Sequence, residues 1–592
     1  SYSVTGVQTC ALPIYLISHL LMGIHGGSII LPPRFTPIGI VRTDTRMKME
    51  RGIMEIWRIN VRSKTFTREE VPADWRQLGG RGLLAKILLD EVNPVCHPLG
   101  PGNKLIFSPG LLVGHMLSSC DRISIGAKSP LTGGVKEANA GGSTGLILAR
   151  LGIKALIVED IPDDSDWWIV HVGIGGVRFD PANDLIGLGV YESAQSLRER
   201  YGGKVAISLI GPGGEMCMAA AGIQNLDKDG VPSRIAARGG IGAVMGSKKI
   251  KAIIWDGTGA DKPPLAHPQA YREAQKNFTR LLLEQKTVQT YHDYGTAAMT
   301  MVCNAFGSLP VRNFSQGNSE DAEKISGELM REVILQRGGK ANPTHACMAG
   351  CAIQCSNVYA DSKGEEIVSP LEYETISLMG SNLGIFHLDD IARMNWDVND
   401  LGLDSIEIGA ALGVAAEAGL AELGNSGSMM NLLAEIRKGS PLGRVLGNGA
   451  VVTGKVFGVL RVPAVKGQAM SGYEPRAIKG TGVTYATSPQ GADHTSGLTI
   501  RAKVDHLDPK GQADLSRSAQ INMAGFDTLG ACIFSGSGFA AAPEAIRDLL
   551  NARYGWEVGT DVLQVLGRAT LSLEREFNRR AGFTPADDRL PE

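Results

Sequence analysis

The chain has 592 residues, too many for one hydrophobic core, so two to four domains are expected from its length. Hydrophobic residues make up 43% and charged residues 20%, a balance typical of a globular enzyme and not of a disordered chain. The 59 basic residues nearly cancel the 61 acidic ones, and no apolar stretch reaches the roughly 18 residues of a membrane span, so we expect binding to neither nucleic acid nor membrane.

Residues 1–48 are expected to be a non-native extension. The segment VTGVQTCALPI (residues 4–14) resembles a translated sequencing adapter rather than part of a folded domain. Residues 15–46 lack the basic start and the small-residue cleavage site of a signal peptide. We therefore expect the native protein to begin at Met47, Met49 or Met54.

Two kinds of periodicity divide the rest of the chain. Short apolar runs separated by turns predict strands at 55–61, 104–107, 123–125, 155–158 and 205–209. Beyond residue 263, longer amphipathic segments predict helices at 269–283, 388–400, 405–418 and 429–435. The sequence thus predicts an α+β fold with a β-rich domain at 49–262 and a mainly α-helical part from residue 263 onward.

The cysteines indicate a metal site. Cys347, Cys351 and Cys355 are separated by three residues each in THACMAGCAIQCSN, and Cys532 lies far along the chain. Three local thiolates and a distant one commonly hold a [4Fe-4S] cluster. Two alternatives remain: the i, i+4, i+8 spacing suits buried packing on one helix face, and structural zinc is possible without its usual CxxC pairs. Without a secretory signal the thiols are expected to be reduced, in the cytoplasm.

Glycine-rich segments indicate anion binding. RGGIGAVMGSKK (residues 238–249) predicts a bend that enters a small-residue helix flanked by cations, which suits a phosphate. Its GxGxxxG pattern is one residue off the dinucleotide fingerprint, and tight helix packing explains it as well. A second segment, residues 122–145 (RISIGAKSPLTGGVKEANAGGSTG), combines an Arg, Lys residues and an Asn with six glycines. Together the two segments predict a large, phosphate-bearing cofactor.

Several motifs, taken in order, resemble the aldehyde:ferredoxin oxidoreductase family from about Met54 to the C-terminus. They are LGGRGL, KSPLTGG, ANAGG, RGGIGAVMGSKK, the cysteine triplet, EYETI, NDLGLD and DTLGAC. The resemblance implies an N-terminal β-rich base for two pterins that hold one tungsten or molybdenum. It also implies two α-helical domains that cover this base, expected at 263–463 and 464–592. It also implies electron transfer through one [4Fe-4S] cluster.

The resemblance implies roles for individual residues. Those at the pterin phosphates and their Mg²⁺ are Arg122, Asn139, Gly141, Arg234, Ala236 and Arg238. The first pterin clamp contains Asn399, Leu403 and Asp404, and the second contains Asp527 and Ala531. The cluster ligands are Cys347, Cys351, Cys355 and Cys532. Glu374 is the expected base for activating water, and His494 the expected hydrogen-bond donor to the aldehyde carbonyl.

Some positions depart from the family pattern. Asn399 stands where the first clamp usually has Asp, and Gln490 and Ser496 replace basic residues near His494. Arg393 stands where members that share a metal ion between subunits have Glu, so a homodimer, if one forms, is expected to lack a bridging iron.

The implied reaction is oxidation of a small aldehyde with water to the carboxylic acid, with ferredoxin or a small iron–sulfur subunit as electron acceptor. A runner-up in the same family is the catalytic subunit of a multi-subunit tungsten reductase acting on an activated acid or aromatic thioester. Two other classes stay open from the residues alone. One is a flavin or nicotinamide enzyme that uses RGGIGAVMG for a dinucleotide, and the other is a non-catalytic electron carrier.

Overall fold

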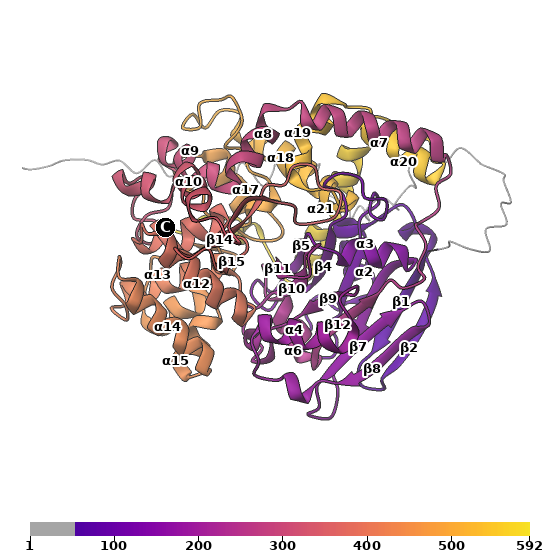
Figure 1. The fold of residues 1–592 in the computed structure, drawn as a ribbon, viewed down its shortest axis with the longest axis horizontal. Coiled ribbons are helices and arrows are strands. Elements are labelled where there is room, and N and C mark those ends of the chain that lie inside the picture. The colour runs from indigo at the N-terminus through magenta and orange to yellow at the C-terminus, as the bar shows by residue number, and fades with distance from the viewer. Residues whose placement is uncertain (1–53) are drawn as a thin grey trace, which may run out of the picture.

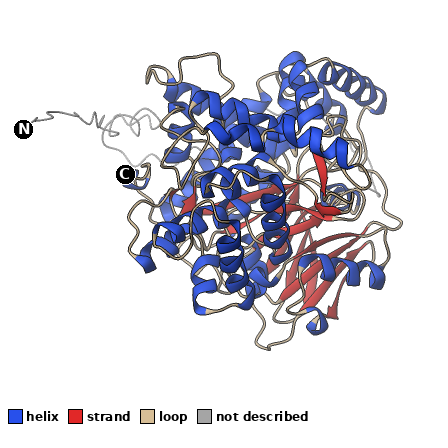
Figure 2. Cartoon of the chain, turned by 60° about the vertical axis from the view of Figure 1, so that its left-hand side comes forward, coloured by secondary structure: helices blue, strands red, loops and turns tan. Residues whose placement is uncertain are grey.

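The computed structural model describes residues 54–592, so the predicted extension at 1–48 lies outside the described residues. Strands gather in the first 260 residues and helices in the remainder, which packs over the sheets (Figures 1 and 2). All the predicted strands and helices are present, and the α+β prediction is confirmed. None of the helices in the described part of the chain is long and apolar enough to cross a membrane.

The first sheet has six strands in the order β2-β1-β6-β3-β4-β5. They are β1 (Glu55–Asn60), β2 (Thr65–Glu70), β3 (Leu105–Pro109), β4 (Ile123–Lys128), β5 (Val135–Ala140) and β6 (Ile153–Glu159). Helix α2 (Gly80–Glu91) precedes β3, and α3 (Thr144–Arg150) precedes β6. Strands β1 and β6 are parallel, and the other neighbours are antiparallel.

The second sheet repeats this topology, with the order β11-β10-β9-β12-β7-β8. Its strands are β7 (Trp168–Gly173), β8 (Gly176–Pro181), β9 (Ala206–Leu209), β10 (Ile223–Leu226), β11 (Pro232–Ala236) and β12 (Ile250–Asp256). Helix α4 (Val190–Tyr201) and the short α5 (Pro212–Glu215) flank β9, and α6 (Ile241–Ser247) precedes β12. In each sheet the first two strands form a hairpin, and the last strand pairs in parallel with the first. The domain is therefore a structural duplication, which the periodicity of the sequence had not indicated.

The two sheets share one hydrophobic core. The rings of Phe107 on β3 and Trp255 on β12 meet edge to face with centroids 5.4 Å apart. Both side chains are fully buried, together with apolar residues from both sheets. Because each sheet buries a face against the other, their edges at β5 and β11 are held side by side under the helices.

Two larger hydrophobic cores and two smaller ones lie in the described helical region, and the larger two organise most of its helices. One contains α10 (Gly327–Arg337), α12 (Leu388–Leu401), α13 (Ser405–Glu417), α14 (Ser426–Lys438) and α15 (Pro441–Gly447). The other contains α7 (Pro268–Leu283), α8 (Lys286–Tyr294), α18 (Gln512–Leu529), α19 (Gly536–Ala541), α20 (Ala545–Tyr554) and α21 (Val562–Arg580). Phe278 of α7 stacks on Phe539 of α19, so helices from both predicted α-helical domains share this core. The domain boundaries at 262 and 463 stay predictions.

Shorter elements complete the helical region. They are α9 (Met299–Phe306), α11 (Tyr373–Thr375), α16 (Ala450–Phe457), α17 (Lys479–Thr487), β13 (Asn342–His345), β14 (Ser356–Ala360), β15 (Glu366–Val368), β16 (Ala464–Val465) and β17 (Gln468–Ala469). Several of them carry residues of the site described next.

Candidate active site and cluster site

Two helices end in the same way at the predicted clamps. Helices α12 and α18 stop at Gly402 and Gly530, whose φ values of 69° and 76° are left-handed and easy only for glycine. The chain turns back after each glycine, and the N–H of Leu403 donates to the carbonyl of Val398 at 3.0 Å. Ala531 makes the equivalent bond at 2.9 Å, so the NDLGLD and DTLGAC segments have the same backbone shape.

Each clamp lies on a different sheet. The N–H of Gly222, before β10, donates to the Gly402 carbonyl at 2.9 Å. The N–H of Arg122, before β4, donates to the Gly530 carbonyl at 3.2 Å. The two clamps are therefore related by the duplication of the sheets.

The side chains of the two clamps differ in charge. Asp527 accepts hydrogen bonds from Arg81 Nη1 and from Asn139 Nδ2, both at 3.1 Å. Burial raises the pKa of Asp527 and of its neighbour Glu137, while Arg81 lowers both. The first clamp has neutral Asn399 at the corresponding position.

Asp404 of the first clamp has local partners. One of its oxygens accepts the N–H of Ile406 at 3.0 Å and caps α13. The other accepts Arg238 Nε at 3.3 Å. The expected hydrogen bond from Asp404 to a pterin stays a prediction.

The predicted phosphate-binding residues lie along β5 and β11. Arg122 Nε donates to the Asn139 side chain, and Arg234 Nη2 donates to Ser356 Oγ at 2.9 Å. Arg238 donates to the carbonyls of Ala469 and Ala492, each at 2.6 Å. Ala236 is buried at the end of β11.

This arrangement fits an anionic group. Arg234 and Arg238 are buried there and Arg122 is half-buried, and Arg234 Nε is buried without a hydrogen-bond partner among the described residues. Such a donor carries a desolvation penalty that a bound phosphate would relieve. A Cβ at Gly141 would lie 3.1 Å from Cys347 Sγ, so the small residue keeps this region open beside the cysteine loop.

The cysteine loop is irregular, which overturns the interpretation of Cys347, Cys351 and Cys355 as one face of a helix. Instead, Ser119 connects it to the distant thiol. Ser119 Oγ lies 3.3 Å from Cys351 Sγ, and the Ser119 carbonyl accepts the N–H of Cys532 at 2.8 Å. Burial raises the pKa of Cys532, opposed by the nearby Arg122 cation.

The spacing of the sulfur atoms differs from that of a single-ion site. Ligand sulfurs around one tetrahedral zinc lie about 3.8 Å apart. No three of these cysteine sulfurs lie within 4.8 Å of one another among residues 54–592. The assignment of the four thiols to a [4Fe-4S] cluster stays a prediction.

Glu374 and His494, 120 positions apart, are brought together. Glu374 lies in α11 and accepts the Gly472 N–H at 2.8 Å through Oε2. Its Oε1 lies 3.7 Å from His494 Nδ1, too far for a hydrogen bond. Both atoms are buried and lack partners among the described residues. Burial raises the pKa of Glu374, opposed first by His494.

Matches to family models follow the two halves of this architecture. The model described as the N-terminal domain of aldehyde ferredoxin oxidoreductase matches residues 56–257, and the model for domains 2 and 3 matches residues 273–592. The chain belongs to the aldehyde ferredoxin oxidoreductase family. It is therefore an oxidoreductase, as the motifs predicted.

Curated relatives agree with this assignment. The tungsten-containing aldehyde ferredoxin oxidoreductase of Pyrococcus furiosus is 32% identical over 550 residues, covering 88% of this chain and 87% of the relative. The Thermococcus kodakarensis protein of the same name matches with the same identity and coverage. A WOR-like subunit of an aliphatic sulfonate oxidoreductase from Pyrococcus furiosus is 29% identical, and 72% of each chain is covered.

A solved structure shares the fold of this family member. It is the active-site complex of a benzoyl-coenzyme A reductase with 1,5-dienoyl-CoA, with a TM-score of 0.76 and 20% identity. The match covers 91% of this chain and 90% of that one. At this identity the comparison concerns the fold alone.

The family motifs contain further buried charges that the sequence analysis did not assign. Arg81, in LGGRGL, binds Glu574 with Nε and Nη2 at 2.7 and 2.9 Å. Gln490 donates to Glu574 at 2.8 Å and accepts Lys136 Nζ at 3.1 Å. Lys136 also donates to Asp493 at 2.5 Å. Arg81 stands in LGGRGL and Lys136 in the second glycine-rich segment, whereas Glu574 lies in neither.

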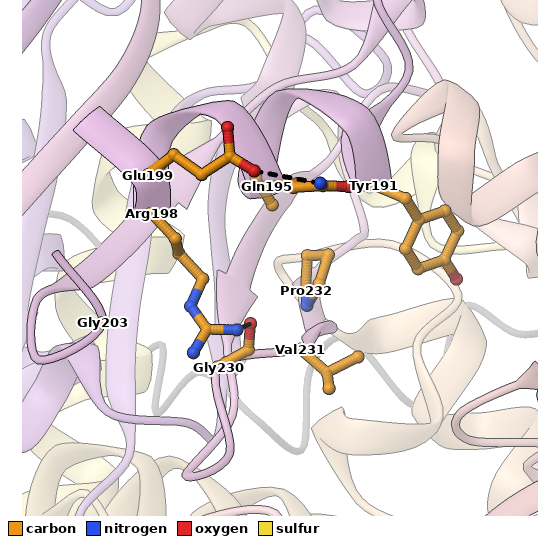
Figure 3. Close-up of a pocket in the computed structure, with 9 residues that line it drawn as sticks. Tyr191, Gln195, Arg198, Glu199, Gly203, Gly230, Val231 and Pro232 are labelled. Carbon is orange, nitrogen blue, oxygen red and sulfur yellow. Dashed lines mark hydrogen bonds between the residues drawn. The ribbon is translucent and has the colours of Figure 1, made fainter. Parts of the chain in front are cut away.

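A surface pocket of about 480 Å³ lies apart from the candidate site (Figure 3). It is bounded by α4 and the turn before β11, where Arg198 Nη1 donates to the Gly230 carbonyl at 3.3 Å. None of the predicted site residues lines it.

Proposed function

We propose that this protein oxidises a small aldehyde with water to the carboxylic acid. One observation carries the proposal: Glu374 Oε1 and His494 Nδ1 are buried, unpartnered among residues 54–592 and 3.7 Å apart. A base and a hydrogen-bond donor so placed suit addition of water to a carbonyl group. The relatives named as tungsten-containing aldehyde ferredoxin oxidoreductases support the same reaction.

The residues that would hold the cofactors are those predicted from the sequence. Arg122, Asn139, Gly141, Arg234, Ala236 and Arg238 would hold the phosphates of two pterins and their Mg²⁺. Asn399, Leu403, Asp404, Asp527 and Ala531 would contact the pterin rings, and Cys347, Cys351, Cys355 and Cys532 would bind one [4Fe-4S] cluster. When bound, the tungsten or molybdenum bis-pterin would accept two electrons from the substrate.

The protein's own residues would move the protons. Glu374 would take a proton from water as the water oxygen bonds to the aldehyde carbon. His494 would donate a hydrogen bond to the carbonyl oxygen as negative charge develops there. Aldehyde and water together yield the carboxylic acid, two protons and two electrons, which balances the reaction.

Cys532 would link the second clamp to the cluster, because it follows Ala531 directly. Electrons would leave singly through the cluster to ferredoxin or to a small iron–sulfur subunit. The second candidate function is the catalytic subunit of a multi-subunit tungsten reductase that acts on an activated acid or aromatic thioester. The WOR-like subunit and the benzoyl-coenzyme A reductase support keeping this alternative.

Elemental analysis and turnover of anaerobically purified protein test the proposal. We expect one tungsten or molybdenum and about four irons per chain, and aldehyde-dependent reduction of ferredoxin. Protein that holds both metals, oxidises no aldehyde and instead reduces an aromatic thioester would favour the second function. Protein without tungsten or molybdenum would contradict both.

The cluster assignment has its own test. Cys532→Ser should lower iron content and disturb pterin binding, whereas Cys96→Ser, another half-buried thiol, should change neither. A full complement of iron with an unchanged spectrum in Cys532→Ser would show that the ligand assignment is wrong.

A further inference from the structure

Lys136 is a fully buried cation whose partners lie in a distant part of the chain. Its side chain on β5 is 0% exposed, and Nζ lies 2.5 Å from Asp493 Oδ2 and 3.1 Å from Gln490 Oε1. A buried ammonium group is costly unless a close anion compensates it. The carboxylate of Asp493, 2% exposed, is that anion.

Asp493 uses its other oxygen for the turn that carries His494. Oδ1 accepts the N–H of Thr495 at 2.9 Å and its hydroxyl at 2.8 Å. These bonds cap the short 3-10 turn His494–Ser496 at its N-terminus. One carboxylate oxygen therefore serves the cation and the other serves the turn.

The geometry leaves the imidazole unengaged. His494 Nδ1 lies 3.6 Å from Asp493 Oδ1 and 3.7 Å from Glu374 Oε1, beyond hydrogen-bond range of either. The other cation near this carboxylate is Arg238, whose Nη1 lies 4.0 Å from Asp493 Oδ1. Arg238 is engaged by two backbone carbonyls and by Asp404, which leaves Lys136 as the closer partner of Asp493.

We propose that Lys136, acting through Asp493, is the positioning residue for His494. The ammonium group holds Oδ2, which directs Oδ1 to the turn and keeps the carboxylate from swinging onto the imidazole. Nδ1 then stays available to the substrate, beside Glu374. This inference rests on the proposed function, in which His494 faces the substrate.

Lys136→Met is the direct test, because Met keeps the length and apolar stem while removing the cation. We expect kcat to fall by about 10²-fold with little change in KM, since displacement of a catalytic group by about 1 Å costs that much. Tungsten and iron contents should stay at the wild-type level.

Lys251→Met is the matched control. Lys251 on β12 is equally buried, and its Nζ lies 2.5 Å from Glu215 Oε1, away from His494. The Lys251→Met variant should lose stability for the same physical reason as Lys136→Met, but it should retain the wild-type kcat. An equal fall of kcat in both variants would overturn the positioning role.

Asp493→Asn and the double variant with Lys136→Met test the coupling. If Lys136 acts through Asp493, the double variant should lose no more of kcat than the worse single variant. It also removes both buried charges, so it decides the question if Lys136→Met fails to fold. Losses of kcat that multiply would contradict the proposal.

Amide hydrogen exchange of residues 494–497 gives a readout apart from activity. Exchange should become faster in Lys136→Met and in Asp493→Asn, in protein with or without cofactor, and stay unchanged in Lys251→Met. Faster exchange without any effect on turnover would mean that Lys136 orders the turn but that His494 has no part in the reaction, so the proposed function would fail. Unchanged exchange, or selective loss of tungsten from Lys136→Met, would overturn the inference itself.

Discussion

At the scale of single residues, the environments of Glu374 and His494 separate them from ordinary surface groups. Both side chains are half-buried, and the atoms that face each other are buried and have no partner among residues 54–592. Nearby Tyr373 and Asp404, in contrast, are occupied by bonds to backbone. Unsatisfied buried polar atoms are costly, and they persist mainly where function requires them.

Replacing Glu374 by Gln keeps its shape and its hydrogen bond from Gly472 but removes the base. We expect kcat to fall by about 10²- to 10⁴-fold at unchanged tungsten and iron content, and a similar fall for a His494→Gln variant. The two losses should not multiply in the double variant if both groups act on one transition state. Metal-replete single variants within about threefold of wild type would contradict both roles.

The pH dependence of turnover follows from the buried position of Glu374. Burial raises the pKa of its carboxyl above the ordinary 4.5, although His494 opposes the effect. A base works only when deprotonated, so kcat/KM should rise with pH through this raised pKa and be lost below it. The acidic limb should therefore lie above pH 4.5. An identical limb in Glu374→Gln would assign it to another group.

At the scale of elements, the ends of α12 and α18 matter more than their lengths. Each helix stops at a left-handed glycine that brings its backbone against a sheet. A Cβ on Gly530 would lie 2.5 Å from Val113 Cγ2, whereas a Cβ on Gly458, at the end of α16, would meet nothing within 4 Å. The two glycines have similar φ values of 76° and 70°.

Comparing alanine variants of Gly458 and Gly530 separates the cost of backbone strain from the cost of close packing. Gly458→Ala should cost about 1–2 kcal/mol, the price of a left-handed alanine. Gly530→Ala should lower the melting temperature further and reduce pterin content, because the second clamp must also move. Equal shifts in melting temperature with full pterin content in both variants would argue against a packed clamp at Gly530.

At the scale of the whole molecule, the duplicated sheets provide two clamp positions with different charges. The second clamp lies beside Arg81, Glu137 and Glu574, and its last residue is a predicted cluster ligand. The first has neutral Asn399 and ends at Asp404, paired with Arg238. The two clamp positions are therefore not equivalent, and the second adjoins the cysteine loop through Cys532 and Ser119.

Subunit assembly is the remaining prediction at this scale. Arg393 on α12 is exposed and paired with Asp390 at 3.4 Å, and a cation is a poor metal ligand. We expect no iron bound between subunits, so iron should stay at about four per chain in any oligomer. A higher iron content, with the additional iron at a subunit interface, would contradict this expectation if the Arg393→Glu variant has the same iron content as the wild type.

The sequence by itself determined the features that depend on neighbours along the chain. The predicted strands and helices follow from periodicity, and the local cysteine triplet follows from its spacing. The motifs, read together, also identified the family. The roles of the predicted site residues remain for the experiments above to test.

Only the tertiary structure decided which distant residues meet. Ser119 lies between Cys351 and Cys532, and Lys136 pairs with Asp493, yet each pair is separated by more than a hundred positions. That Glu374 faces His494 was implied by the family resemblance, but no local pattern indicated it. The duplication of the sheets was likewise visible only as topology. The physical reason is that periodicity and spacing record local backbone preferences, whereas these contacts arise when separate elements bury their apolar faces together and carry their polar side chains with them.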